Sequence, residues 1–366
     1  MLKLRRGRVV EADPLIVEVD GERRRAWADE ALVGEVRVGD EVVVNTEALD
    51  LGLGSGGFDV VHVNLTRGLS APGASGEHVM KLNYTSLQHP VRPLEGEGSA
   101  DEADPNGGGA ADDATRPVPV LVIQLHGQLA PALWAARQVN AGLRIAYVQT
   151  PGGALPGALS RDVAGFRERG WLAAHVTAGP CHGGEHEAIS VAGGIDGAAR
   201  ALGCDAVIAG PGPGILGSAS RLGHGGMAAL DTAHAALALG LPTLLAPRLS
   251  SSDPRPRHRG LSHHTKVVLE MLLAPVRVPV PETETEGWPL LDAGAPEGGS
   301  QREALEELIN ATKGRHDLLV RTIDLDGYAA SGLPARTMGR TIKEDPLFFA
   351  AALAAGGALA DLAAGA

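Results

Sequence analysis

The chain contains very little cysteine. Its 366 residues include two, Cys181 and Cys204. Two cysteines cannot supply the disulfide framework that stabilises small secreted domains. The sequence therefore predicts a protein of a reducing, cytoplasmic environment.

The chain also lacks a positive charge balance and strongly apolar ends. Its formal net charge is −12, whereas a nucleic-acid-binding protein is expected to carry a basic surface. The start, MLKLRRGRVVEADP, is charged and has no apolar signal core. The tail from Phe348 to Ala366 is mostly Ala and Gly, and Asp361 interrupts it, so we expect a packed helix rather than a membrane span. Nucleic acid and membrane are therefore excluded from the expected partners.

Residues 1–65 predict a small β-barrel. Short apolar strands alternate with turn pairs such as Asp20-Gly21 and Gly39-Asp40. We interpret this barrel as an appendage or an oligomerisation surface, and we expect a homo-oligomer. Residues 66–91 form a connecting segment. Within it, HVMKLNYTSLQHPV is either a plain connector or a segment that lays Lys81 and Tyr84 across the mouth of a ligand site.

Two segments have the composition of linkers. Residues 92–116 are acidic and carry Leu94 as their one large apolar residue, so we expect disorder there. Residues 281–300 combine acids, proline and glycine and predict a second linker. The α/β core is expected over 117–280, and a helix, strand and helix over 301–366 are expected to complete it.

The core predicts the fold class. Apolar strands alternate with helical patterns, for example the strand 143–149, the helix 158–168 and the helix 185–202. This alternation is typical of a parallel, doubly wound, Rossmann-like sheet. The glycine-rich and polar loops all follow strands, so they would lie together at the carboxyl edge of the sheet, where ligands bind in such folds.

A glycine loop follows the fourth core strand. GPGILG matches the G-x-G-x-x-G pattern, but glycines continue to Gly226 and the next strand ends in Pro247-Arg248 instead of an acid. A dinucleotide site and a P-loop are therefore disfavoured. Two alternatives remain: a structural loop, and a loop whose backbone N–H groups cradle an anion. The residues of the second alternative are Gly212, Gly214, Gly217 and Ser218.

The segment HGGEH matches the H-x-x-E-H metalloprotease signature through His182 and His186. That chemistry needs both histidines on one face of a continuous helix, and two glycines stand between them. The favoured interpretation is a loop in which Glu185 and His186 cap a helix. A metal held by His182 and His186, or a ligand or nucleophile pair formed by Cys181 and His182, is the alternative.

The loop RLSSSDPRPRHRGLSHHTK after the fifth core strand is the main candidate site. Arginine forks bind phosphate or carboxylate at two points, and histidine is both an acid or base near neutral pH and a metal ligand. The expected anion contacts are Arg248, Arg255, Arg257, Arg259 and Ser262. The expected acids, bases or metal ligands are His258, His263, His264 and His224, with Asp253 as their orienting group. His224 would face this loop if the two strands that precede the loops are neighbours. The alternative interpretation is a basic loop that is merely solvated and has no functional role.

Four motifs together resemble one family. They are HVMKLNYTSLQ, GPGPGILGS with GHGG, RHRGLSHHT and TMGRTIKEDPLFF. The chain resembles the bacterial proteins of domain-of-unknown-function family 3866, over nearly its whole length apart from 92–116. The resemblance implies no reaction and assigns no residue a role.

These patterns predict a protein that binds a small anionic, phosphorylated ligand and hydrolyses it or transfers a group on it. The cofactor is open, and a divalent metal is one option. The competing hypothesis is a non-catalytic ligand sensor or assembly module.

Overall fold

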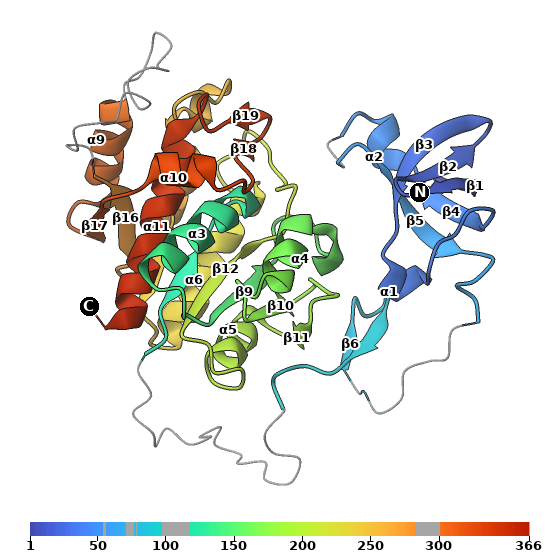
Figure 1. Ribbon diagram of the computed structural model, residues 1–366, viewed down its shortest axis with the longest axis horizontal. Helices are drawn as coiled ribbons and strands as arrows, with labels where there is room; N and C mark the ends of the chain where they lie inside the picture. Colours follow the sequence, from blue (N-terminus) through green and yellow to red (C-terminus); the bar gives the residue numbers. More distant parts are fainter. Residues whose placement is uncertain (54–55, 71–76, 78, 97–116, 283–300, 366) are drawn as a thin grey trace. The chain divides into compact units, whose positions relative to one another are not determined.

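The computed structural model describes residues 1–53, 56–70, 77, 79–96, 117–282 and 301–365. The chain divides into two compact units, Met1–Arg92 and Pro93–Ala366 (Figure 1). Each is described by itself. Most of the two predicted linkers, 97–116 and 283–300, lies outside the described residues.

The first unit contains a closed barrel of five strands, in the order β1-β2-β3-β5-β4. Its inward valines, such as Val17 and Val42, are fully buried and alternate with exposed polar residues. The predicted barrel is thereby confirmed. A separate hairpin follows it. The strands and helices of this unit are β1 (Leu4–Ala12), β2 (Leu15–Val19), β3 (Glu22–Trp27), α1 (Glu30–Val33), β4 (Glu41–Asn45), α2 (Glu47–Asp50), β5 (Asp59–Asn64), β6 (Val79–Lys81) and β7 (His89–Val91).

The second unit is built on an eight-stranded sheet in the order β11-β10-β9-β12-β8-β13-β16-β17. All neighbouring strands pair in parallel. Its central strands are continuous apolar runs that are buried on both faces, as parallel sheets require. The strands are β8 (Val120–Val122), β9 (Ile145–Thr150), β10 (Ala174–Ala178), β11 (His186–Ala188), β12 (Ala206–Pro211), β13 (Thr243–Leu245), β16 (Arg277–Pro281) and β17 (Asp317–Arg321).

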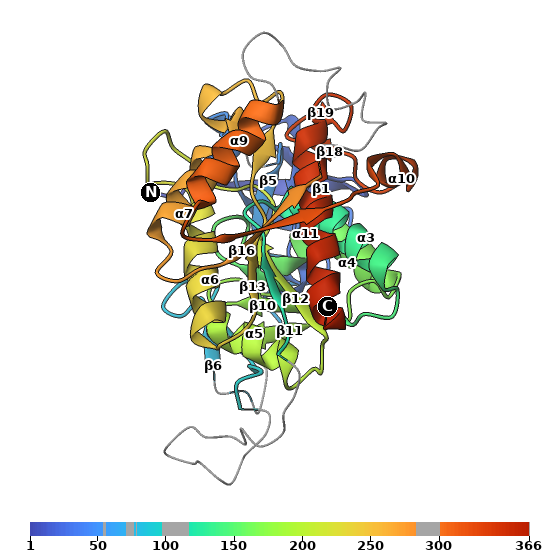
Figure 2. The same ribbon diagram turned by 90° about the vertical axis from the view of Figure 1, so that its left-hand side faces the viewer.

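Helices cover both faces of this sheet, each over its own apolar core (Figure 2). One face carries α5 (Val191–Ala199), α6 (Ala228–Ala238), α7 (His263–Met271) and α9 (Gln301–Thr312). The other carries α3 (Leu129–Val139), α4 (Arg161–Glu168), α10 (Leu325–Ala330) and α11 (Pro346–Ala364). The mixed α/β class with a parallel sheet and a β-barrel is confirmed.

One predicted helix is wrong at its start. The expected helix over 185–202 is replaced by strand β11, and α5 begins only at Val191. The reason lies far away in the sequence, because the carboxylate of Glu95 accepts the N–H groups of Ile189 and Ser190 and fixes an extended turn there. Glu185 therefore precedes strand β11, His186 begins it, and neither residue caps a helix. Residues Pro93–Glu95, expected within the first linker, pack on the core, and Leu94 is buried.

The C-terminal helix α11 is a core helix of the second unit. By length and composition alone it could cross a membrane, and 78% of its most apolar window is buried inside the protein. It packs against α3 so closely that a side chain at Gly356 would put its Cβ 1.9 Å from the carbonyl oxygen of Ala132. Gly357, the next residue, has open space around its Cβ position.

These adjacent glycines give a matched test of the packing. We expect Gly356→Ala to lower the free energy of unfolding by about 1–3 kcal/mol, because the helices must separate. Gly357→Ala should be neutral or stabilising by up to about 1 kcal/mol, since alanine favours a helix over glycine. Urea denaturation of both variants measures the difference. Equal midpoints would contradict the close contact between α3 and α11.

Candidate functional site

The site lies where the chain changes its direction across the sheet. From β8 the chain first builds outward through β9, β10 and β11, and then returns to β12 and crosses to β13 on the other side of β8. In open α/β sheets, the crevice at such a reversal is where ligands bind. The glycine loop follows β12 and the basic loop follows β13, so both flank the carboxyl end of β8.

Buried amide groups after β8 hold the basic loop in place. The Gln124 side chain donates to the hydroxyl of Thr265 at 3.0 Å and to the carbonyl of Ala246 at 3.3 Å. The Thr265 hydroxyl in turn accepts the backbone N–H of Arg248 at 2.9 Å. These bonds fix where the loop leaves β13 and where it re-enters α7.

The loop folds back on itself as a two-stranded ribbon, β14 (Leu249–Ser250) with β15 (Gly260–Leu261), around the short helix η4 (Pro256–His258). Ser262 caps α7, because its hydroxyl accepts the N–H of His264. The same hydroxyl bonds the His258 ring at 2.8 Å. Ser262 is fully buried and committed to this cap.

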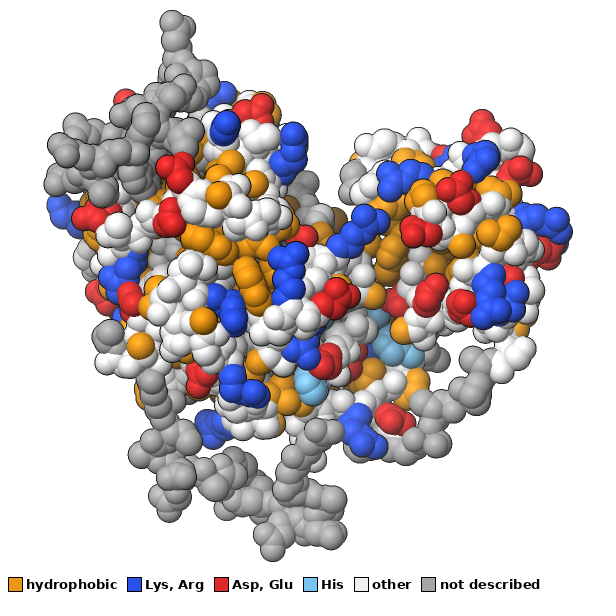
Figure 3. Space-filling view, in the orientation of Figure 1, with side chains coloured by type: hydrophobic (Ala, Val, Ile, Leu, Met, Phe, Trp, Pro, Cys, Tyr) orange, Lys and Arg blue, Asp and Glu red, His pale blue; other side chains and the backbone are white. Residues whose placement is uncertain are grey.

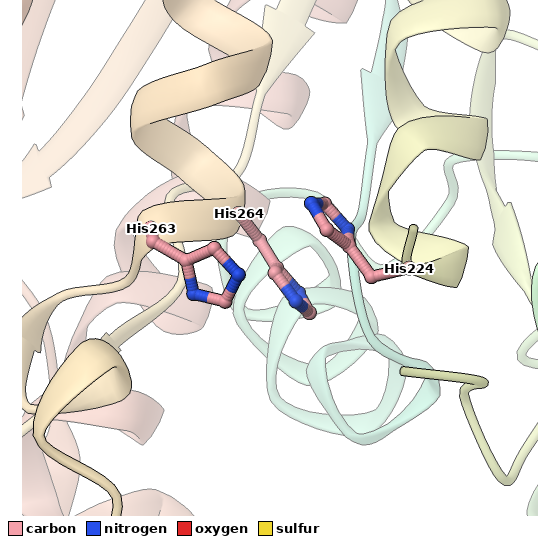
Figure 4. A group of neighbouring side chains, drawn as sticks. All are labelled: His224, His263 and His264. Carbon is pink, nitrogen blue, oxygen red and sulfur yellow. The ribbon is translucent and has the colours of Figure 1, made fainter. Parts of the chain in front are cut away.

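Four histidines meet at this point. His263 and His264 project from the first turn of α7, and His224 comes from the segment before η3 (Gly225–Met227) and α6 (Figure 4). The His224 and His264 rings stack with centroids 3.7 Å apart, and His263 lies 4.4 Å from His264. His258 lies 4.8 Å from both His263 and His264. The expectation that His224 faces the basic loop is met although β12 and β13 are not neighbours, since β8 lies between them.

These histidines are neutral at neutral pH. Burial lowers the pKa of His264 to about 2, helped by the neighbouring His224 and by the charge of Arg248. Burial, with the charges of Arg248 and Arg255, lowers the pKa of His258 to about 3. Burial also lowers the pKa values of His224 and His263. Each ring therefore presents one lone pair, which suits it to accept a proton or bind a metal ion.

Three arginines converge on a buried carboxylate beside the histidines. Asp253 is fully buried and accepts two bonds of 2.9 Å from Arg255, and Arg248 and Arg340 each approach it at 3.4 Å. Burial alone would raise the pKa of Asp253, but the hydrogen bonds from Arg255 and the charge of Arg340 outweigh it and hold that pKa well below its usual range. Asp253 thus orients arginines, whereas the sequence suggested that it orients histidines.

The remaining predicted anion contacts differ in their surroundings. Arg257 is exposed, and its side chain forms no hydrogen bond or ion pair with the residues that the structure describes. Arg259 approaches the carbonyl of Asp253 at 3.4 Å. Arg248, with its side chain 2% exposed, is the most buried of the set, and burial lowers its pKa to about 10 despite Asp253.

The glycine loop packs against the loop that follows β9. A Cβ at Gly212 would lie 2.5 Å from the carbonyl of Ala154, and Gly214 has a positive φ of 72°. Ser218 donates to the carbonyl of Gly223 within the loop, and Gly217 stands in open space. The close approach of the two loops explains Gly212 and the positive φ explains Gly214, whereas nothing in these contacts explains Gly217.

Other predicted residues lie elsewhere. His182 is buried in the loop after β10, and His186 begins β11. Among the described residues, the grouping of side chains that could hold a metal consists of His224, His263 and His264 and does not include them. Lys81 and Tyr84 belong to the first unit, in the β6–β7 hairpin, where Lys81 is buried and Tyr84 is exposed.

Sequence reasoning missed two charged members of the site. Arg340 and Asp345 come from the TMGRTIKEDP segment and bond each other at 3.0 Å. Asp345 also accepts bonds from Ser250 and Ser251 at 2.7 and 2.8 Å, which ties this segment to the basic loop. The distinctive motif TMGRTIKEDPLFF was the one sequence feature that could have indicated a role for this segment.

A second polar group is built from residues on and around β9 and β10. His126 bonds Ser160 at 2.8 Å and Tyr147 at 3.3 Å, and the Tyr147 ring stacks on His175. Burial lowers the pKa of His126 to about 4. Burial, with the charge of His126, also lowers that of His175 to about 4.

This second group predicts acid sensitivity. An unfolded histidine binds a proton below about pH 6.5, whereas the folded chain binds none until the pH nears 4, so stability falls as the pH falls through this window. The loss is up to about 1.4 kcal/mol per pH unit for each histidine. We expect His175→Gln to reduce the slope of the unfolding free energy against pH between about pH 6.5 and 4, by up to the contribution of one bound proton. Urea denaturation at several pH values measures it, with about pH 8 as the reference, where histidine is neutral in both states. An unchanged slope would contradict the burial of a neutral His175.

The family model described as "Protein of unknown function (DUF3866)" matches residues 25–356. No curated protein and no solved structure gives a significant match. The matched range includes the barrel strands β4 and β5 with the end of β3, the whole parallel sheet and every residue of the histidine and arginine site. The chain therefore belongs to the DUF3866 family of proteins of unknown function.

Proposed function

We propose that the protein binds a small anionic ligand, of the phosphate-ester class, at the carboxyl end of β8, and hydrolyses it or transfers a group on it in the cytoplasm. The sheet order supports this position, because the reversal at β8 is the feature that places ligands in Rossmann-like folds. The fold alone does not select the chemistry, so the side chains must carry the argument.

The charge balance at Asp253 is the observation that carries the proposal. Three guanidinium groups, those of Arg248, Arg255 and Arg340, face two carboxylates, those of Asp253 and Asp345, which leaves one positive charge uncompensated. The Nε–H of the buried Arg248 has no partner among the described residues. A buried donor on a cation is costly unless an acceptor meets it, and an anionic oxygen would do so.

Binding of a small anion requires a local cluster of positive charge and does not require a broad basic surface. On the face drawn in Figure 3, the coloured side chains of Pro93–Ala366 show acidic and basic groups interspersed, with no extended basic patch among the described residues there. A concentrated cluster of arginines in an acidic protein suits a small anion better than a polymer.

The neutral histidines suit a proton-transfer role toward such a ligand. His263 is the least buried of the clustered rings, and its Nε2, which is itself buried, has no partner among the described residues. The lone pair on this nitrogen can either accept a proton from an attacking hydroxyl or water or bind a metal ion.

The alternative function is a non-catalytic ligand sensor or assembly module. Tyr84 favours it, because this aromatic side chain is 97% exposed on a backbone with a positive φ of 61°, and strained backbone and exposed tyrosines are typical of contact surfaces. A sensor would bind the anion without turning over a phosphate monoester, and it would assemble through the first unit as a homo-oligomer.

Arg257→Ala tests the anion site without disturbing the fold, since this side chain is exposed and unpaired among the described residues. Phosphate monoesters at 100 times their dissociation constant should stabilise the wild-type protein by about 2.7 kcal/mol in a thermal-shift titration. We expect the variant to bind about tenfold more weakly or worse, because a hydrogen bond to a charged group contributes about 1.5–3 kcal/mol.

Arg200→Ala is the matched control. Arg200 is a surface arginine at the end of α5, paired with Asp196, and its loss should leave the thermal shift unchanged. Equal shifts in wild type and Arg257→Ala would remove Arg257 from the site. The absence of a shift with every phosphate compound would overturn the proposed function and favour the assembly module.

A further inference from the structure

We propose that His224, His263 and His264 hold a divalent cation, with zinc as the best-suited metal, beside the guanidinium of Arg248. The inference deepens the proposed function, because it rests on the same site and names a cation that binds the anion together with the arginine. Its support comes from the histidine rings themselves.

The lone pair of His224 is fixed by its backbone partner. Its Nε2 lies 3.0 Å from the carbonyl oxygen of Arg221. A carbonyl only accepts, so Nε2 carries the proton and Nδ1 presents a lone pair. That Nδ1 is buried and has no hydrogen-bond partner among the described residues.

His263 repeats the arrangement with its nitrogens exchanged. Its Nδ1 lies 3.3 Å from the carbonyl oxygen of Arg257, so Nδ1 carries the proton. The lone pair is then on Nε2, which is buried and likewise unpartnered within the described chain. Metal-ligating histidines are commonly oriented in this way, with the second ring nitrogen donating to a backbone carbonyl.

His264 supplies the third lone pair. Its Nδ1 lies 3.3 Å from Nη1 of Arg248, and a guanidinium only donates, so Nδ1 accepts. One ring nitrogen from each of the three histidines lies within 4.8 Å of the other two. Nitrogen atoms of all three rings therefore lie close together, and two of the lone pairs assigned above have no donor among the described residues. Buried acceptors without donors call for an explanation, and a bound ion is one.

The space between the rings fits a metal after a small closure. Tetrahedral zinc with Zn–N bonds of about 2.0–2.1 Å places its ligand nitrogens about 3.4 Å apart. The farthest pair must approach by about 1.4 Å, which rotation of the stacked rings can supply. Gly226 leaves room, since a Cβ there would lie 2.9 Å from His264 Nδ1 and 3.0 Å from His224 Nδ1. Three histidines with a fourth position open are the ligand set of catalytic zinc sites.

Arg248 couples the cation to the anion. A metal bound by His264 removes the acceptor that Arg248 now uses, and the two positive charges repel each other. An anion placed between them would relieve this repulsion and accept from Nη1 of Arg248, which the bound metal leaves without its present acceptor. Metal and anion should therefore strengthen each other's binding by the same factor.

Zinc titration of the chelator-treated full-length protein, followed by calorimetry and by elemental analysis after dialysis, tests the inference. We expect one zinc per chain. His263→Gln and His224→Gln should each weaken binding by about 10- to 100-fold or more, because the loss of an outer partner of a metal ligand alone costs that much. His186→Gln is the control and should bind as wild type does. Urea midpoints of the variants confirm that each is folded.

The outcomes separate the two proposals. Absence of zinc binding by the wild-type protein, or unchanged affinity in both His263→Gln and His224→Gln, would overturn the metal site. Loss of zinc binding in His186→Gln alone would show that the metal binds at the HGGEH segment, and this result would also overturn the proposed histidine site. Repeating the titration with phenyl phosphate present measures the coupling, and a rise in zinc affinity supports the shared site. Zinc binding without any effect of phenyl phosphate would support the metal site and contradict the proposed function. A thermal shift caused by phenyl phosphate without zinc binding would support the proposed function and contradict the metal site.

Discussion

The buried carboxylate of Asp253 is the constraint on which the site depends. An ionised carboxylate removed from water is unfavourable unless it is well paired, and here three arginines and the backbone N–H of Arg255 surround it. Two of these arginines, Arg248 and Arg255, lie in the basic loop, and Arg340 lies near the C-terminus. One acid thereby folds the loop back on itself and joins it to a segment 87 residues away. A loop with this many positive charges and no internal acid would instead extend into solvent.

The position of the histidines follows from that folded loop. The ribbon brings Gly260 and Leu261 back beside β14, and the chain can then begin α7 with Ser262 as its cap. Because Ser262 caps the helix, His263 and His264 occupy its first turn, directly over the end of β8. Burial at this position keeps the rings neutral. Their lone pairs are therefore available, and the guanidinium groups of Arg248 and Arg255 bring positive charge close to them.

The sequence predicted those parts of the fold that depend on local patterns. Buried parallel strands are continuous apolar runs, and barrel strands alternate between turn pairs, so the barrel and most of the parallel sheet could be predicted without tertiary information, whereas strands β11 and β16 were not predicted. The helix expected from Glu185 failed because a distant carboxylate, Glu95, determines the local backbone. The roles of Arg340 and Asp345 could not be predicted for the same reason, since their partners lie 87 to 95 residues away.

The position of the candidate site on the sheet could be predicted from the sequence, but the arrangement of its side chains could not. Carboxyl ends of parallel strands share one edge, so the loops containing His224 and His264 were expected near each other. We expected these loops to meet because the strands that precede them would be neighbours, yet β8 separates β12 from β13. The loops meet because they follow β12 and β13, which lie on opposite sides of β8. Each loop contributes one ring to the stacked pair of His224 and His264, whose centroids lie 3.7 Å apart. A ligand that inserts between them must exchange that stacking for coordination or hydrogen bonds, which restricts the ligand to one that all the converging lone pairs can bind at once.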